Sequence, residues 1–398
     1  MRLEPAPSPA EDPREARALR PYREPASAAS RALLLTARAE QTEASRRELR
    51  AACGSLGQPI LRRAAQQNRC EALVGVTLRE LLGEAFDPSW RRAVEENRAR
   101  VDALTGALLE ALQALEACGA RGAVIEGGST VFSAGLAPAA YGAGDFDLLV
   151  DEDRFNDCLE ALAARGFQAP ERAGRAITSR VQLRHPSTVR ELWIEVGARA
   201  FDRLWVPLRL KQPAAHWLAR RQPGVDPRVW VLHPSDALCV ALVHASLHSY
   251  VLSPALRLQV DIDRAARHPG VDWDEVTHTL REMGAATRAF ASLMLARALL
   301  GTPIPEQALT RLMPNGARWD SLRRLLEAEG VLTDGRPKLR GSSRVRLDYL
   351  LWDAPRRAWL QNLLWPEATW LARHHGPLPL WRAQARRYLR LGRARLGR

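Results

Sequence analysis

Two short stretches of this chain combine residue types that could do chemistry together. Gly127 and Gly128 follow an apolar run, and Asp145 and Asp147 flank Phe146 a little further along. Paired glycines let backbone N–H groups approach a ligand without a Cβ in the way. Two carboxylates at i and i+2 of a strand share one face, where their charges repel, and a divalent cation relieves that repulsion. Mg²⁺ suits such a site because it prefers carboxylate and phosphate oxygens. The spacing therefore predicts a site for Mg²⁺ and a phosphorylated ligand.

Two expected strands must position these residues. Residues 123–126 are apolar enough for a short strand, and residues 144–150 predict a second strand that carries both aspartates. After the glycines, Ser129 and Thr130 are expected to cap a helix whose N-terminus attracts phosphate. The expected nucleotide-binding residues are Gly127, Gly128, Ser129 and Thr130.

A third carboxylate would complete the cation site. The segment 189–196 alternates as a half-buried strand does, which places Glu191 and Glu195 on one face. Glu195 is preferred because it lies deeper in the apolar run, further from the polar turn at 185–188. Glu191 is the alternative.

These features together resemble the DNA polymerase β nucleotidyltransferase superfamily. Within it they are similar to a family of uncharacterised bacterial nucleotidyltransferases sometimes found beside peptide natural-product genes. The matching stretches are 124–129, 144–150 and the helix that follows with 165–167, then 232–238, the helix with His244 and His248, 261–263, 271–273 and the arginine-rich end.

The resemblance implies that Asp145 and Asp147 hold two Mg²⁺ ions as catalytic and metal-binding residues. Glu195 would help to position the ion that activates the acceptor. In-line displacement at the α-phosphate of a nucleoside triphosphate such as ATP would then transfer a nucleotidyl group and release pyrophosphate. The acceptor stays open among a small molecule, a peptide of a natural-product pathway, a protein side chain and an RNA end.

Two residues depart from the family pattern. Many relatives carry Lys where this chain has Glu126, and Arg where it has Tyr141. Both changes remove positive charge near the expected triphosphate. Either arginines from elsewhere replace it, or the protein is a nucleotide-binding pseudoenzyme or an accessory protein of a biosynthetic pathway.

His244 and His248 share one face of an apolar helix. This spacing can bind zinc, but no third ligand is evident, so packing within a helical domain is the preferred interpretation. Asp261 is expected to be a buried partner of the histidines, and Asp263 is expected to be incidental.

Composition limits the function classes. The chain has 398 residues, of which 46% are apolar and 26% charged, an ordinary balance for a soluble protein. No apolar run approaches the ~20 residues of a membrane span, and no signal peptide is evident, so we expect a cytoplasmic protein. The five cysteines lie far apart, which favours reduced core thiols.

The formal charge of +13 raises the possibility of an RNA partner, which we do not favour. Only Lys211 and Lys338 are lysines, and such an arginine and alanine bias is what a GC-rich coding sequence produces. Residues 381–398 predict a basic amphipathic helix. Its leucines are expected to dock on the body; contact with RNA, an acidic protein or a membrane surface is the alternative. The late tryptophans, at 352, 359, 365 and 370, are expected to pack in a core.

We expect an α+β fold, with a mixed-sheet nucleotidyltransferase core flanked by N-terminal and C-terminal helical domains. The predicted units are a disordered arm over 1–30, a helical module over 31–119, the core over 120–210, a helical domain closing the cleft over 232–300, and C-terminal helices with a basic end over 301–398.

Overall fold

The computed structural model of the chain describes most of the sequence after the N-terminal segment. The described residues are 28–396 except 84–85, 134–135, 143, 170–179, 186–191, 198–199, 202–209, 211–212, 249, 251–254, 330–331, 333–341, 367–370 and 372–377. The predicted arm therefore lies outside the described residues up to residue 27.

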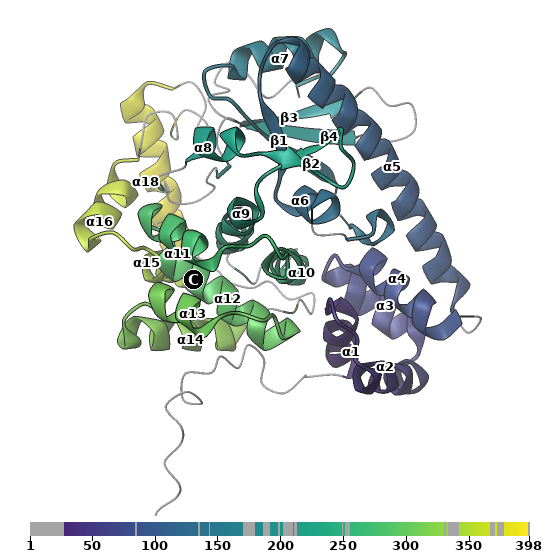
Figure 1. The fold of residues 1–398 in the computed structure, drawn as a ribbon. Helices are drawn as coiled ribbons and strands as arrows, with labels where there is room; N and C mark the ends of the chain where they lie inside the picture. The colour runs from purple at the N-terminus through teal and green to yellow at the C-terminus, as the bar shows by residue number, and fades with distance from the viewer. Residues whose placement is uncertain are drawn as a thin grey trace, which may run out of the picture.

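A mixed sheet of six described strands forms the centre of the fold (Figure 1). The strands are β1 (Gly122–Ile125), β2 (Asp145–Val150), β3 (Arg180–His185), β4 (Leu192–Gly197), β5 (Gln222–Pro223) and β6 (Trp230–Val231), in the order β3-β4-β2-β1-β6-β5. β2 pairs antiparallel with β1 and parallel with β4. The strands expected around residues 123, 145 and 192 are therefore neighbours. The α+β class is confirmed.

Helices α5 (Pro88–Ala117) and α6 (Gly127–Phe132) pack on the sheet, and two glycines in the sheet and in α6 make that contact close. A Cβ at Gly122 would lie 2.7 Å from Leu115 of α5, and one at Gly128 would lie 2.5 Å from Val124. Phe146 is fully buried beneath α6 and stacks on Tyr141 with ring centroids 5.5 Å apart. This face is apolar, so by the alternation of a strand Asp145 and Asp147 belong to the other face.

The N-terminal helices end in α5, which spans 30 residues and runs past the sheet (Figure 1). The helices before it are α1 (Ala28–Ala37), α2 (Glu43–Leu56), α3 (Gln58–Gln67) and α4 (Glu71–Leu82). The Asp87 carboxylate caps α5 by accepting a 2.7 Å hydrogen bond from the Ser89 N–H. Two further helices lie between the strands in the chain: α7 (Phe155–Ala164) follows β2 and contacts α5, and α8 (Ala214–Ala219) follows β4 and contacts β2.

A helical bundle follows the sheet, and its second helix, α10, packs against α6. Its helices are α9 (Pro234–Leu247), α10 (Ala255–Ala266), α11 (Trp273–Glu282), α12 (Ala286–Leu300) and α13 (Glu306–Leu312). Asp263 is fully buried and accepts hydrogen bonds from the Thr302 hydroxyl at 2.7 Å, Arg267 Nε at 3.0 Å and the Ala39 N–H at 3.3 Å. The expectation that Asp263 is incidental is wrong, because this carboxylate joins α10 to two other parts of the chain.

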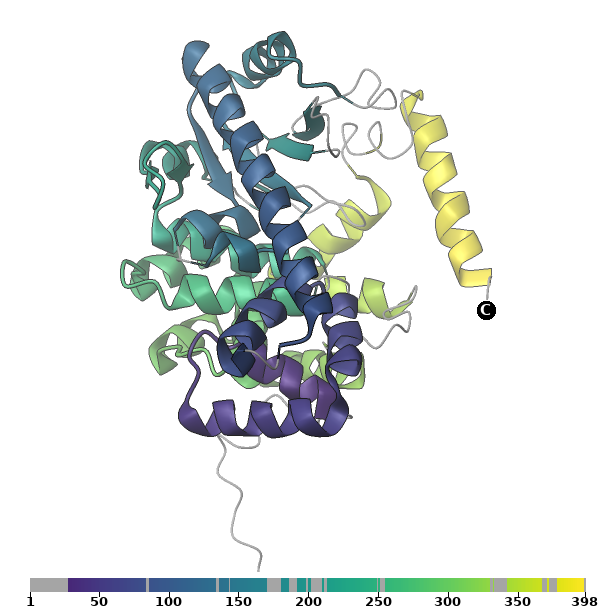
Figure 2. The same cartoon turned by 90° about the vertical axis from the view of Figure 1, so that its right-hand side faces the viewer.

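The C-terminal helices extend along one side of the bundle (Figures 1 and 2). They are α14 (Gly316–Glu329), α15 (Ser342–Leu350), α16 (Arg356–Leu364) and α18 (Leu380–Leu396). Trp359 is buried as expected, but Trp365 is 65% exposed, and Leu380 and Leu389 are also exposed. The expectation that Trp365 packs in a core is therefore wrong, and so is the expected docking of Leu389, whereas Trp370 and the side chains of Leu391 and Leu396 lie outside the described part of the structure. None of the described helices is both long and apolar enough to cross a membrane.

Candidate functional site

The two aspartates lie near the start of β2 in different surroundings. Asp147 is 8% exposed, whereas Asp145 is half-buried and accepts a 3.3 Å hydrogen bond from Gln182 Nε2. In the sheet register, Asp147 lies opposite Ile125 of β1 and opposite Glu195 of β4. Positions that lie opposite each other on adjacent strands share a face of the sheet. The backbone therefore gives positions 147 and 195 the same side, although the Glu195 side chain and the whole of Glu191 lie outside the described part of the structure.

The glycine turn joins β1 directly to α6, which begins at Gly127 after Glu126. Glu126 has φ 58° and ψ −139°, a conformation that costs free energy for a residue with a Cβ. The predicted capping by Ser129 and Thr130 is wrong because both lie inside the helix. The Ser129 hydroxyl donates to Val124 O at 2.9 Å, and the Thr130 hydroxyl donates to the Asp261 carboxylate at 3.1 Å. Both hydroxyls therefore hold α6 in place, and all four residues from Gly127 to Thr130 are buried.

Arg257 of α10 brings a cation to the site that the sequence reasoning did not identify. Its guanidinium carbon lies 5.6 Å from the centre of the Tyr141 ring, and a Cβ on Gly127 would lie 3.2 Å from its Nη1. Burial alone would lower the pKa of Arg257, but Asp261, Tyr141 and Asp145 raise it above its ordinary value, so the side chain stays charged. Nε and Nη1 are buried and find no hydrogen-bond acceptor among the described residues. Two N–H groups of a buried cation thus lie near Asp145 and the glycine turn.

Glu126 faces the helical bundle and contacts His244 there. The Glu126 carboxylate lies 2.7 Å from His244 Nδ1 of α9, and the rings of His244 and His248 stack with centroids 4.9 Å apart. Burial and the neighbouring His244 lower the pKa of His248 to about 4. The expected partner of the histidines, Asp261, is buried as expected; its carboxylate accepts a hydrogen bond from Thr130, and His244 acts on its pKa through charge, without a hydrogen bond or ion pair between these two described side chains. The acid that contacts His244 therefore comes from the glycine turn and not from α10.

Helix α5 holds the loop that leads into the aspartate strand. Asn97 Nδ2 donates to the carbonyl oxygens of Ala139 and Tyr141, both at 2.9 Å. Arg100 Nη2 donates to Gly144 O at 3.3 Å, directly before Asp145. These contacts fix where β2 begins. No short motif marks Asn97 or Arg100, because their partners lie more than forty residues away.

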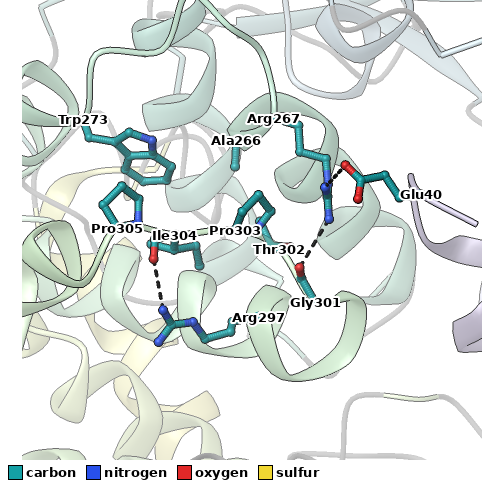
Figure 3. Close-up of a pocket in the computed structure, with 10 residues that line it drawn as sticks. All are labelled: Glu40, Ala266, Arg267, Trp273, Arg297, Gly301, Thr302, Pro303, Ile304 and Pro305. Atoms are coloured by element: carbon teal, nitrogen blue, oxygen red, sulfur yellow. Dashed lines mark hydrogen bonds and ion pairs between the residues drawn. The ribbon is translucent and has the colours of Figure 1, made fainter. Parts of the chain in front are cut away.

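An open cavity of about 740 Å³ lies at another place in the fold and contains none of these residues (Figure 3). It lies between the C-terminal ends of α10 and α12 on one side and Glu40 on the other. Glu40 belongs to the connection between α1 and α2. Arg267 extends to Glu40 and to Gly301 O, and Arg297 to Ile304 O. Both guanidinium groups are engaged with protein acceptors, so the cavity does not have the free positive charge that a phosphate site needs.

The aspartates are chemically suited to Mg²⁺. Two carboxylates on one strand face are oxygen donors of the kind that Mg²⁺ shares with substrate phosphates. Among the described side chains, no group of three or more His, Cys, Asp or Glu is arranged to hold a metal ion. Asp145 and Asp147 thus fit as part of a site that substrate phosphates and a further acid would complete.

A family model described as uncharacterised nucleotidyltransferase matches residues 58–301. The match covers more than half of the 398 residues and runs from α3 through α12. Both aspartates, the glycine turn, His244 and Arg257 lie within it. No curated protein and no solved structure is significantly similar to the chain.

Proposed function

This chain belongs to the family of uncharacterised nucleotidyltransferases, and from that premise we propose that it moves a nucleoside monophosphate group from a nucleoside triphosphate to an acceptor. The acceptor group is a hydroxyl or a protein or peptide side chain, and a natural-product pathway is the proposed setting. The single observation that carries the proposal is the register of β2 and β4, in which Asp147 and Glu195 are opposite each other beside the glycine turn.

In this proposal Asp145, Asp147 and Glu195 hold Mg²⁺. When bound, the ion neutralises charge on the triphosphate and on the attacking and leaving oxygens. The pleat of β2 orients Asp145 and Asp147 toward the same side, and the Asn97 and Arg100 contacts keep that strand in place. The protein therefore contributes a preorganised pair of carboxylates at the reacting phosphate.

Arg257 supplies the positive charge that Glu126 and Tyr141 do not. In this proposal Nε and Nη1 of Arg257 donate to phosphate oxygens, and the position of the guanidinium against Tyr141 limits its movement. Glu126 carries negative charge at the turn, but it is directed to His244. The two departures from the family pattern are thus compatible with triphosphate binding. Because Arg257 belongs to α10, the bundle is expected to contribute to the nucleotide site.

The decisive experiment incubates the purified protein with Mg²⁺ and labelled nucleoside triphosphates and measures pyrophosphate release and label transfer. Asp147→Asn keeps the size of the side chain but removes the charge, so release should fall at least about 1,000-fold, an effect of about 4 kcal/mol on the barrier. Asp153→Asn is the matched control, since Asp153 is exposed and follows β2. It should keep the wild-type rate.

Two results would count against transfer chemistry. Equal rates for the wild-type and Asp147→Asn proteins would remove this carboxylate from the reaction. Triphosphate binding without any pyrophosphate release would instead support a nucleotide-binding pseudoenzyme or accessory protein.

A further inference from the structure

The outer surface formed by α16 and α18 exposes large apolar side chains. On α18, Trp381 is 66% exposed and Leu389 is 63% exposed, and at the end of α16 Leu364 and Trp365 are exposed as well. The two helices meet here, because the Tyr388 hydroxyl donates to Leu364 O at 2.6 Å. Exposed apolar side chains that gather in one place on a soluble protein usually mark a binding surface.

The orientation of α18 is the reverse of what an ordinary amphipathic surface helix adopts. Among the α18 side chains that the structure describes, which run from Leu380 to Leu389, Ala383 and Arg387 are buried and lie one turn apart, and Arg387 is only 4% exposed. Trp381, Tyr388 and Leu389 lie on a different face, at the i, i+7 and i+8 spacing of one helix side. Over its described side chains, the helix therefore turns a small residue and an arginine toward the protein and Trp381 and Leu389 away from it. Figure 2 shows α18 along the outer edge of the molecule.

The charge of α18 and of the segment before it has one sign. Residues 368–398 contain eight arginines and no Asp or Glu. Arg382 and Arg386 are exposed, and by helical spacing they border the apolar face next to Leu389. The Arg382 guanidinium carbon also lies 5.0 Å from the Trp381 ring centre. A partner for this surface must accept apolar side chains and present negative charge beside them.

We propose that the α16–α18 surface docks on an anionic lipid bilayer. Trp and Tyr side chains prefer the headgroup level of a bilayer, leucines enter the acyl boundary, and arginines at the rim pair with anionic headgroups. A single-stranded RNA fits less well, because RNA uses aromatic rings and cations but has no use for exposed leucines. The exposed leucines at 364 and 389 therefore favour the lipid surface.

The test is co-sedimentation of the full-length protein with vesicles. Wild-type protein should bind phosphatidylglycerol-containing vesicles at least about tenfold more tightly than pure phosphatidylcholine vesicles, and added salt should weaken the binding. The double variant Trp381→Ser with Leu389→Ser should lose about tenfold in binding to the anionic vesicles. Arg382→Gln with Arg386→Gln should show a comparable loss and a smaller dependence on salt.

Matched control variants remove exposed side chains of the same kinds at other places on the surface. Ile60→Ser with Val225→Ser removes two exposed apolar side chains, and Arg92→Gln with Arg98→Gln removes two exposed arginines of α5. Both control variants should bind vesicles as the wild type does. Circular dichroism and the melting temperature of each variant establish that a loss of binding is not a loss of fold.

Three outcomes would overturn the proposal. Wild-type protein that stays in the supernatant with anionic vesicles would refute it. Wild-type binding by the Trp381→Ser, Leu389→Ser variant would remove the apolar face from the contact. Binding of a single-stranded RNA oligonucleotide that needs Arg382 and Arg386, with no vesicle binding, would assign the surface to RNA.

Discussion

At the scale of single residues, the site depends on polar side chains of the bundle that reach residues of the sheet core. Arg257 lies against Tyr141 and Gly127, and Glu126 lies against His244. In each pair one member belongs to the sheet core and the other to the bundle. The cation for the proposed triphosphate is therefore supplied across an interface.

Arg257→Gln should weaken triphosphate binding, and its effect on the free energy of binding should exceed its effect on the free energy of unfolding. Charge-assisted hydrogen bonds contribute about 1.5–3 kcal/mol each, so we expect the dissociation constant of the triphosphate to rise by about 10- to 100-fold. Arg281→Gln, at an exposed arginine of α11, is the control and should bind normally. Titration of both variants with labelled triphosphate measures the effect. Unchanged affinity in Arg257→Gln would mean that Arg257 serves only as a structural partner of Asp261.

His248 should make stability depend on pH. Burial and His244 lower its pKa to about 4 in the folded chain, whereas an unfolded histidine titrates near about 6.5. The unfolded chain thus binds this proton first. The contribution of neutral His248 to the free energy of unfolding is therefore fully present above about pH 6.5. It declines, by at most about 3 kcal/mol, as the pH falls toward 4.

His248→Gln should flatten that pH dependence between pH 6.5 and 4, as measured by urea unfolding. Burial raises the pKa of Asp236 to about 6, so that carboxyl makes the protein more stable as the pH falls, opposite to the effect of His248. The effect of His248 is therefore obtained from the difference between the wild-type and variant pH profiles. His278→Gln, at an exposed histidine of α11, is the control. The assignment fails if His248→Gln and His278→Gln give the same pH profile.

At the scale of elements, the contact of α6 with the sheet depends on the absence of a side chain at Gly128. A Cβ there would lie 2.5 Å from Val124 and 3.0 Å from Phe146, both of which are buried in the core. The second glycine of the turn thus has a packing role, and it sets how closely α6 approaches β1 and β2. The glycine turn positions the site through this packing.

Gly128→Ala should therefore destabilise the protein by about 1–3 kcal/mol, because overpacking forces neighbouring groups to move. Gly106→Ala in α5 is the matched control, since no atom lies within 4 Å of its added Cβ. That control should stabilise the helix by about 0.5–1 kcal/mol. Urea unfolding of both variants gives the comparison, and a stabilising Gly128→Ala would show that α6 can move without cost.

At the scale of the whole molecule, buried polar contacts join the N-terminal helices, the sheet and the bundle. Asp263 connects α10 to Ala39 and to Thr302. Asp261, which also belongs to α10, accepts a hydrogen bond from Thr130 of α6. α10 is thus the helix that three parts of the chain share, and it also carries Arg257.

Asp263→Ala should lower the free energy of unfolding by about 3 kcal/mol or more, because it leaves Arg267 and Thr302 without their buried acceptor. Asp274→Ala is the control: Asp274 is 76% exposed and pairs with Arg311 at the surface, so its loss should change stability by less than about 1 kcal/mol. Denaturant unfolding measures both. Equal, small effects would mean that the bundle and the N-terminal helices are held together by apolar packing alone.

The sequence by itself determined the features that depend on neighbours in the chain. A short apolar run predicted β1, and alternation along the next two segments predicted β2 and β4 and placed Asp145 and Asp147 on one face. The glycines predicted a tight turn into a helix. These inferences succeed because the pleat of a strand and the freedom of glycine are local properties of the backbone.

Only the tertiary structure decided which distant groups meet. It brought Arg257 to Tyr141, directed Glu126 to His244, made Asp263 a buried junction, and left Trp365, Trp381 and Leu389 exposed. The sequence pattern of α18 is that of an amphipathic helix, but periodicity says only that a helix has two faces. Which face is turned toward the protein depends on the surfaces that neighbouring elements offer, and those surfaces exist only once the chain is folded.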